Sequence, residues 1–507
     1  MAIFILQFYT IYVGLLNIVA VSESVDVAFP PWFQFGSSTA AYQIEGAWNV
    51  SDKGENIWDR FTHADPTVIS DLSNGDVACD SYHLWRRDVE MAVELGLQFY
   101  RISISWSRIL PTGYSNIISE DGKRYYNNLI DALLEKGIEP VITLYHFDLP
   151  QNLQDLGGWT NPLIVQWFSS YARIVYTLYA DRVKTWTTIN EPNILCDLTF
   201  TTGILAPGHI DAKMSPFLCT KHVLLAHAKA WRIYDKQFKP LYHGRVSITN
   251  NLVWMSPVAA RDTSLSKLAL DFTAGRYCNP IYSKEGGWPA STMKLMKEVS
   301  SKEGYDASRL PDLSKEEIEL IRGTYDFFAL NYYTCRLVRR AKPGEKVDTF
   351  FMQGIPELKA VMEVDPENPY GVARFNVHCP KGLRELMAWL KQQYGDLEIL
   401  ITENGVATAG SNLKDVERED FIRTHLEQVL LSIHIDKVNV TGYTYWSLMD
   451  NFEWMDGYEV KFGMYEVDFE SNMRTRTPRS SALYYSNIIR NRALAVNSPY
   501  DNVFQKK

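Results

Sequence analysis

The segment Glu398-Ile399-Leu400-Ile401-Thr402-Glu403-Asn404-Gly405 has the pattern of a buried strand that ends on a charge. Its run of β-branched and leucine residues is typical of a parallel strand covered on both faces. Asn-Gly then signals a turn directly after Glu403. A carboxylate at the end of a buried strand costs free energy unless the fold uses it. A cap or an ion pair would explain one such charge, but a second carboxylate at another strand end would indicate catalysis.

Apolar strand-like runs alternate with helix-like segments on both sides of this segment. Eight strands with intervening helices, and no Gly/Ser linker, predict an α/β fold made of a single (β/α)8 TIM barrel with long βα loops. A doubly wound open sheet is the rival, but no G-x-G-x-x-G motif follows a strand. The charged, Pro/Gly-rich residues 339–376 are expected to form a loop over the barrel mouth. The other expected strands are 33–45, 99–106, 139–145, 183–189, 244–249, 327–333 and 440–447.

Polar and aromatic residues recur where these strands end, which in such a barrel is the face that carries the active site. Glu191 follows the fourth strand and supplies the second carboxylate that Glu403 requires. The other residues at or just beyond strand ends are Gln43, Glu45, His146, Asn190, Asn331, Tyr333, Trp446, Glu453 and Trp454.

Two carboxylates across a pocket with indole, imidazole and amide groups favour glycoside hydrolysis. One group would protonate the departing oxygen while the other attacks or stabilises the sugar. Serine hydrolysis is the competing enzyme class, but the chain has no G-x-S-x-G elbow. No H-E-x-x-H or similar metal-ligand spacing occurs, so we expect neither a metal nor a cofactor.

The sequence resembles glycoside hydrolase family 1, the β-glucosidase family of retaining barrel enzymes, and is most similar to its insect and animal members. The similarity runs over residues 29–492. It is carried by Phe33-Gln34-Phe35-Gly36, Tyr42-Gln43-Ile44-Glu45-Gly46-Ala47-Trp48, Tyr145-His146-Phe147-Asp148-Leu149-Pro150-Gln151, Thr188-Ile189-Asn190-Glu191-Pro192, Asn331-Tyr332-Tyr333-Thr334, Ile401-Thr402-Glu403-Asn404-Gly405 and Tyr445-Trp446-Ser447-Leu448-Met449-Asp450-Asn451-Phe452-Glu453-Trp454.

The resemblance implies that Glu403 is the nucleophile and Glu191 the acid/base of a double displacement. It implies that Tyr333 and Arg101 orient the ionised nucleophile; for Arg101 alone, a bridge between acids inside the barrel is the alternative. It places Trp446 under the sugar ring. The implied hydrogen-bond partners of the sugar hydroxyls are Gln43, His146, Asn190, Glu453 and Trp454.

Three functions stay open at this point. The leading one is a retaining β-glucosidase that also accepts β-galactosides or β-fucosides, because Asn451-Phe452-Glu453-Trp454 resembles the free-sugar pattern. The second is a myrosinase-type thioglucosidase, for which Arg336 is the nearest sulfate contact. The third is a catalytically inactive barrel that only binds its ligand. Phe375 is expected on the leaving-group side.

Residues 1–22 are apolar and uncharged and end on small residues, which predicts a secretory signal peptide ahead of a catalytic domain over residues 23–507. A membrane anchor is the alternative interpretation of this run. The sequons at Asn49 and Asn439 and six cysteines fit a secreted glycoprotein with disulfides, whose pairing the sequence leaves open. A formal net charge of −9 argues against a nucleic-acid partner. We expect a small β-glycoside as partner and no membrane association after leader removal, with a homodimer left open.

Overall fold

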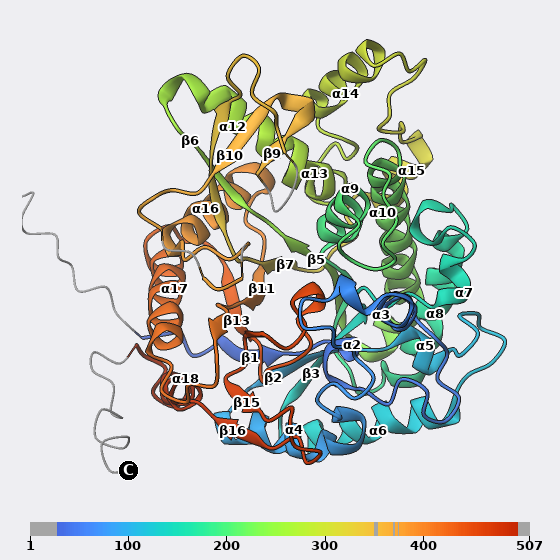
Figure 1. Ribbon diagram of the computed structural model, residues 1–507, viewed down its shortest axis with the longest axis vertical. Helices are drawn as coiled ribbons and strands as arrows, with labels where there is room; N and C mark the ends of the chain where they lie inside the picture. Colours follow the sequence, from blue (N-terminus) through green and yellow to red (C-terminus); the bar gives the residue numbers. More distant parts are fainter. Residues whose placement is uncertain (1–27, 349–352, 369–370, 374, 495–507) are drawn as a thin grey trace, which may run out of the picture.

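A closed barrel of eight parallel strands forms the centre of the computed structural model, which describes residues 28–348, 353–368, 371–373 and 375–494 (Figure 1). The (β/α)8 prediction is therefore confirmed. Around the barrel the strand order is β1-β13-β11-β7-β5-β4-β3-β2. The strands are β1 Gln34–Ser38, β2 Phe99–Ser103, β3 Glu139–Tyr145, β4 Thr185–Asn190, β5 Arg245–Asn251, β7 Phe328–Asn331, β11 Ile399–Asn404 and β13 Val440–Trp446.

Every residue of β2, β4, β7 and β11 is buried, as expected for strands that face side chains inside the barrel and helices outside it. The helices surround the barrel in Figure 1. The longer ones are α4 Ser81–Leu95, α6 Glu120–Glu135, α8 Ile164–Tyr179, α10 Ser215–Ile233, α14 Ala290–Lys302, α16 Pro380–Tyr394, α17 Val416–His434 and α18 Ser480–Asn491.

Two segments differ from the sequence-based expectation. The first strand ends at Ser38, before the expected end at residue 45. Gln43 lies instead in a short helix, α2 Ala41–Ile44, and every residue of that helix is buried. The described part of residues 339–376 is not simply a loop. It contributes β9 Gly354–Ile355 and β10 Ala360–Glu363 to a separate sheet with β6 Trp254–Pro257 and β8 Cys335–Arg340, at the top of Figure 1.

The strand register shifts beside both candidate carboxylates. Between β4 and β5 the shift falls between Thr187 and Asn190, just before Glu191. Between β11 and β7 it falls between Ile401 and Glu403. Such bulges re-aim side chains and are frequent next to active sites. The barrel is therefore irregular at the two places where the chemistry is expected.

Two disulfides link four of the six cysteines: Cys196 with Cys219, and Cys335 with Cys379. Cys79 and Cys278 are buried free thiols. Both sequon asparagines, Asn49 and Asn439, are exposed. The leader expected over residues 1–22 lies outside the described residues. Among the described helices, none has the length and apolar character needed to cross a membrane.

A buried guanidinium ties helix α17 to the loops that follow β11 and β13. Arg418 donates to Asp415 Oδ2 at 2.6 Å and to the hydroxyl of Tyr445 at 2.9 Å. Its other acceptors are the Val406, Lys461 and Phe462 carbonyls and Thr408 Oγ1. Loss of such a group would leave a buried carboxylate and several carbonyls without a donor.

We predict that Arg418→Met destabilises the protein by about 3–5 kcal/mol, the usual cost of breaking a buried ion pair. Arg423→Met is the matched control, since Arg423 lies on the same helix in an exposed pair with Asp420 and should change stability little. Urea denaturation followed by tryptophan fluorescence measures both. Equal midpoints for the two variants would contradict the structural role of Arg418.

Candidate active site

Glu403 lies at the end of β11 and is held by one side chain from within β2 and one that follows β7. Arg101 Nη1, from β2, donates to Glu403 Oε1, and the Tyr333 hydroxyl donates to Glu403 Oε2 at 2.7 Å. Burial, followed by the proximity of Glu403, raises the pKa of Tyr333 well above its usual value, so the phenol stays protonated and donates. Both oxygens of the buried carboxylate are thereby fixed in place.

Glu191 follows β4 in a different environment. Its Oε1 accepts from Asn331 Nδ2 at 2.7 Å and from Asn251 Nδ2 at 2.9 Å. Burial, and then the charge of Glu403, raise the pKa of Glu191 to about 8. The backbone of Glu191 is left-handed, with φ 46°, a strained conformation of the kind that clusters at functional sites. This carboxyl group therefore favours its protonated form at neutral pH.

Arg101 connects the neighbourhoods of the two carboxyl groups. Its Nη2 donates to Asn190 Oδ1 at 2.8 Å, which orients the amide so that Asn190 Nδ2 faces His146 Nε2 at 3.1 Å. Because Nδ2 is a donor, His146 Nε2 must accept and the ring proton lies on Nδ1. Burial and Arg101 lower the pKa of His146 well below its usual value, which keeps the ring neutral.

Gln43 is oriented by the segment after β13. Its Nε2 donates to Asn451 Oδ1 and to the Phe452 carbonyl, both at 2.9 Å. Gln43 Oε1 and His146 Nδ1 are buried and lack a hydrogen-bond partner among the described residues. Burial raises the pKa of Glu453 well above its usual value, with Asp456, Glu403 and Glu191 adding to the shift. The site thus holds several polar atoms that a ligand could satisfy.

Eight of the ten predicted site residues line one cavity: His146, Asn190, Glu191, Tyr333, Glu403, Trp446, Glu453 and Trp454. Gln43 and Arg101 donate hydrogen bonds to two of these lining residues, Glu453 and Glu403. The His146 ring lies nearly parallel to Trp446 and Trp454, with centroids 6.0 and 6.1 Å away. Phe375, expected on the leaving-group side, also lines the cavity.

Sequence reasoning missed the role of two asparagines. The strand-end pattern assigns no function to Asn331 and does not include Asn251, yet both donate to Glu191. The signal for Asn251 was present, because Asn250-Asn251 ends the fifth strand. Glu45, noted at a strand end, instead accepts from Arg108 and Tyr126.

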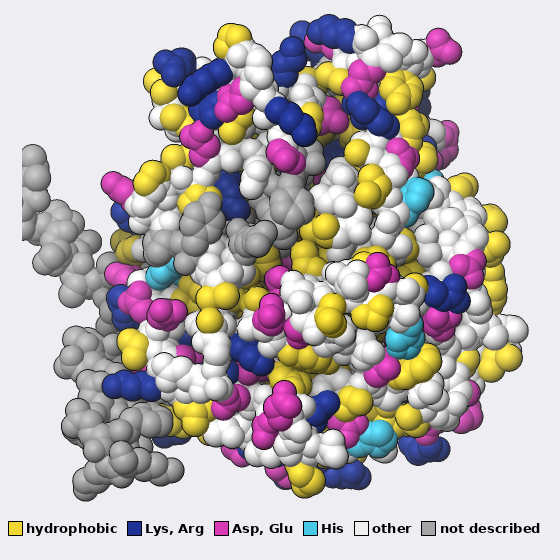
Figure 2. Space-filling view, in the orientation of Figure 1, with side chains coloured by type: hydrophobic (Ala, Val, Ile, Leu, Met, Phe, Trp, Pro, Cys, Tyr) yellow, Lys and Arg dark blue, Asp and Glu magenta, His cyan; other side chains and the backbone are white. Residues whose placement is uncertain are grey.

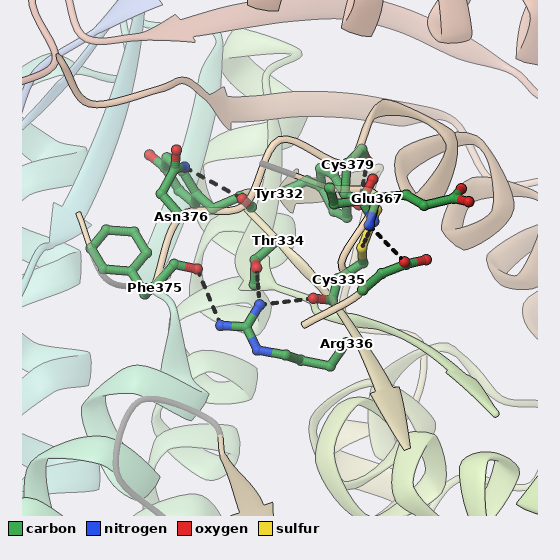
Figure 3. Close-up of a disulfide and its surroundings, with 11 residues drawn as sticks. Tyr332, Thr334, Cys335, Arg336, Glu367, Phe375, Asn376 and Cys379 are labelled. Carbon is green, nitrogen blue, oxygen red and sulfur yellow. Dashed lines mark hydrogen bonds between the residues drawn. A yellow bond between two sulfur atoms is a disulfide. The ribbon is translucent and has the colours of Figure 1, made fainter. Parts of the chain in front are cut away.

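Arg336, the candidate sulfate contact, is buried beside the Cys335–Cys379 disulfide (Figure 3). Its Nη1 donates to Thr334 Oγ1 and, at 2.7 Å, to the Cys335 carbonyl, while Nη2 lies 3.4 Å from the Phe375 carbonyl. The guanidinium therefore organises the loop that carries Phe375, and Arg336 does not line the cavity.

The described residues contain no group of three or more His, Cys, Asp and Glu side chains placed to hold a metal ion. On the face drawn in Figure 2, Lys and Arg side chains are interspersed with Asp and Glu. What the site offers is an asymmetric pair of carboxyl groups in a cavity lined by aromatic and neutral polar side chains.

Known proteins resemble this chain in sequence and in fold. Residues 25–494 match the family model of glycosyl hydrolase family 1. Myrosinase 1 of Brevicoryne brassicae is 43% identical over 92% of this chain and 99% of its own, and the human cytosolic beta-glucosidase is 38% identical over the same shares. The solved structure of an aphid myrosinase superimposes with a TM-score of 0.87 at 42% identity, covering 92% of this chain and all of that one. The chain is a member of glycosyl hydrolase family 1.

Proposed function

We propose that this glycoside hydrolase is a retaining β-glucosidase that cleaves O-glycosidic bonds. The observation that carries the proposal is the contrast between its two buried carboxyl groups. Glu403 is paired with a guanidinium and a phenol, whereas Glu191 receives amide donors from Asn251 and Asn331, and burial with the charge of Glu403 raises its pKa to about 8. Two carboxyl groups whose environments push their pKa values apart can act as nucleophile and acid.

In the first step Glu403 attacks the anomeric carbon while Glu191 gives its proton to the leaving oxygen. The pKa of Glu191 keeps that proton available at neutral pH. The hydrogen bonds from Arg101 and Tyr333 keep the attacking carboxylate in one orientation, which lowers the entropic cost of reaching the transition state.

In the second step a water molecule displaces the sugar from Glu403. Burial and the charge of Glu403 both raise the pKa of Glu191, and formation of the ester removes the second of these causes. The pKa of Glu191 then falls, so Glu191 becomes the base that deprotonates this water. Asn251 and Asn331 support the change, because their N–H groups stabilise the ionised form of Glu191. Two displacements at one carbon retain its configuration.

The sugar is proposed to rest against Trp446, whose indole face suits the C–H face of a pyranose. His146 Nδ1 offers a hydrogen-bond donor, Gln43 Oε1 offers an acceptor, and Asn190 lies beside them. Glu453 and Trp454 complete this side of the cavity. Neutral amides, a neutral imidazole and a carboxyl group whose pKa burial raises fit uncharged hydroxyls better than a phosphate. The proposal extends to β-galactosides and β-fucosides.

We also propose that the protein acts in an oxidising compartment, after removal of residues 1–22. Two disulfides are typical of secreted and lumenal proteins. The exposed side chains of Asn49 and Asn439 are accessible for glycosylation.

A thioglucosidase is the second candidate, because an enzyme named myrosinase is 43% identical to this chain. The contacts of Arg336 weigh against it: its donors face Thr334, the Cys335 carbonyl and the Phe375 carbonyl. The cavity lining likewise includes no Lys or Arg among the described residues. A sulfate group held beside Glu191 would therefore meet no cation in the described lining of this cavity.

Small-nucleophile rescue tests the two roles. We expect Glu403→Gly to abolish glucoside turnover, and azide to restore it with α-glucosyl azide as product, because azide then attacks from the empty side. Glu191→Gly should lower kcat/KM for poor leaving groups by about 10²–10⁴-fold. With azide, the Glu191→Gly variant should form β-glucosyl azide, because azide attacks the glycosyl-enzyme from the side of Glu191. NMR of the products measures this outcome, and interchanged anomers would reverse the assignment.

The pH profile tests the acid. Since Glu191 must be protonated in the first step, kcat/KM for an alkyl glucoside should fall as pH rises through about 8. Asn331→Ala removes a donor that stabilises the ionised form, so the pKa rises and the basic limb moves to higher pH. As control, 2,4-dinitrophenyl glucoside needs no proton on departure and should lack this limb. The same basic limb for both substrates would refute the assignment.

A substrate panel separates the candidates. With 4-nitrophenyl β-glucoside, β-galactoside and β-fucoside and the glucosinolate sinigrin, we expect glucoside turnover to exceed that of sinigrin at least tenfold, because of the missing cation. Higher kcat/KM for sinigrin would replace the O-glucosidase proposal by the thioglucosidase. Folded protein that turns over none of them would support the inactive binding barrel.

A further inference from the structure

A second cavity adjoins the catalytic one on the side of Glu191. It has a volume of about 150 Å³, against about 90 Å³ for the catalytic cavity. The two share Ile194, Leu198 and Asn251 in their linings, and Asn251 is a donor to Glu191. We call this space the distal chamber. Glu191 itself lines only the catalytic cavity, so the two spaces meet beside the group from which the leaving oxygen would take its proton.

The walls of the distal chamber are largely apolar. Phe217 from α10 and Phe272 lie on one side, Met255 from β6 contributes, and Ile355 and Met362 come from the β9–β10 hairpin. The extra sheet at the top of Figure 1 therefore supplies part of the wall. Apolar clefts with a few placed polar groups are the usual form of small-molecule sites.

One polar group in this wall is incompletely satisfied. Arg276, 2% exposed, donates from Nη2 to Asp197 Oδ2 at 2.6 Å and from Nε to the Phe272 carbonyl at 3.1 Å. Its Nη1 has no hydrogen-bond partner among the described residues. The Phe217 and Phe272 rings lie about the guanidinium, with centroids 5.3 and 5.0 Å away. A buried guanidinium N–H without an acceptor is costly, so an oxygen atom of a ligand would be stabilised beside Nη1.

The charges of the chamber favour a neutral ligand. Its charged lining residues are Asp197, Glu357 and Arg276. Asp197 pairs with Arg276, and Glu357 lies 3.4 Å from Arg309. Each arginine charge is therefore balanced by a carboxylate. An anionic leaving group would meet two carboxylates, whereas an uncharged oxygen can accept from Arg276 Nη1.

We propose that the distal chamber binds the far end of an elongated, uncharged and mainly apolar leaving group, and that Arg276 determines specificity by donating to an oxygen near that end. The inference rests on the proposed glucosidase activity and adds its leaving-group class. The natural substrate would then be the β-glucoside of a long or multi-ring lipophilic alcohol with a second oxygen function.

Two homologous series of substrates test whether the chamber binds the leaving group. One is the alkyl β-glucosides from butyl to decyl, and the other has the same chains with a terminal hydroxyl. We expect kcat/KM to rise about tenfold from butyl to octyl as methylene groups become buried. In the hydroxyl-ended series, kcat/KM should be highest for the chain whose terminal hydroxyl reaches Arg276. Cello-oligosaccharides should show no such gain, since their hydroxyls meet an apolar wall.

Filling the chamber should remove the gain. Thr201→Phe, in the chamber wall, is expected to lower the octyl-to-butyl ratio of kcat/KM about tenfold. Thr202→Phe is the matched control: both threonines lie on α9 Thr199–Thr202, both bond to a backbone carbonyl, and Thr202 does not line the chamber. Thr273→Phe fills the opposite wall if Thr201→Phe fails to fold.

Arg276→Lys tests the polar contact, since lysine keeps the positive charge opposite Asp197 but lacks the planar fork. Arg276→Lys should abolish the maximum in kcat/KM of the hydroxyl-ended series and leave unchanged the rise of kcat/KM along the alkyl series. The chamber would be overturned as a leaving-group site by either of two results. One is a wild-type kcat/KM that does not rise along the alkyl series, and the other is an equal octyl-to-butyl ratio for Thr201→Phe and Thr202→Phe. An unchanged maximum in Arg276→Lys would overturn the role of Arg276. Lack of turnover even of butyl glucoside would overturn the proposed function itself.

Discussion

The arrangement of the site depends on one buried positive charge. Arg101 extends from β2 across the barrel end to Glu403 on β11 and to Asn190 on β4, and it also donates to Thr143 on β3. A buried guanidinium is tolerable only when its donors are satisfied. The strand ends that satisfy it are therefore fixed relative to one another, and His146 is oriented in turn through Asn190.

The barrel could be predicted from the sequence because its strands are continuous apolar runs ended by turns, a pattern that local chemistry determines. The short α2 could not, since a segment buried on all sides carries no periodicity that separates strand from helix. The small sheet of β6, β8, β9 and β10 was missed for another reason: its strands are brief and pair residues from separate loops.

Most of the candidate site followed from listing what stands at each strand end, because parallel strands in a closed barrel bring those ends together. Listing strand ends does not identify side chains that affect the reaction only by hydrogen-bonding to a catalytic residue. Asn251 matters through one hydrogen bond to Glu191, which joins the ends of two strands 60 residues apart in the sequence, and no local pattern predicts such a contact. Cavity walls are harder still: the distal chamber is assembled from segments as far apart as Ile194 and Met362.

The Cys335–Cys379 disulfide joins the start of β8 to the residue before α16, so the chain between them is a covalently closed loop. Within that loop lie the β9–β10 hairpin and Phe375. If a peptidase cuts the backbone anywhere between the two cysteines, both fragments remain joined through sulfur. The hairpin and the segment of Phe375 would thus stay attached to the barrel on both sides of a nick.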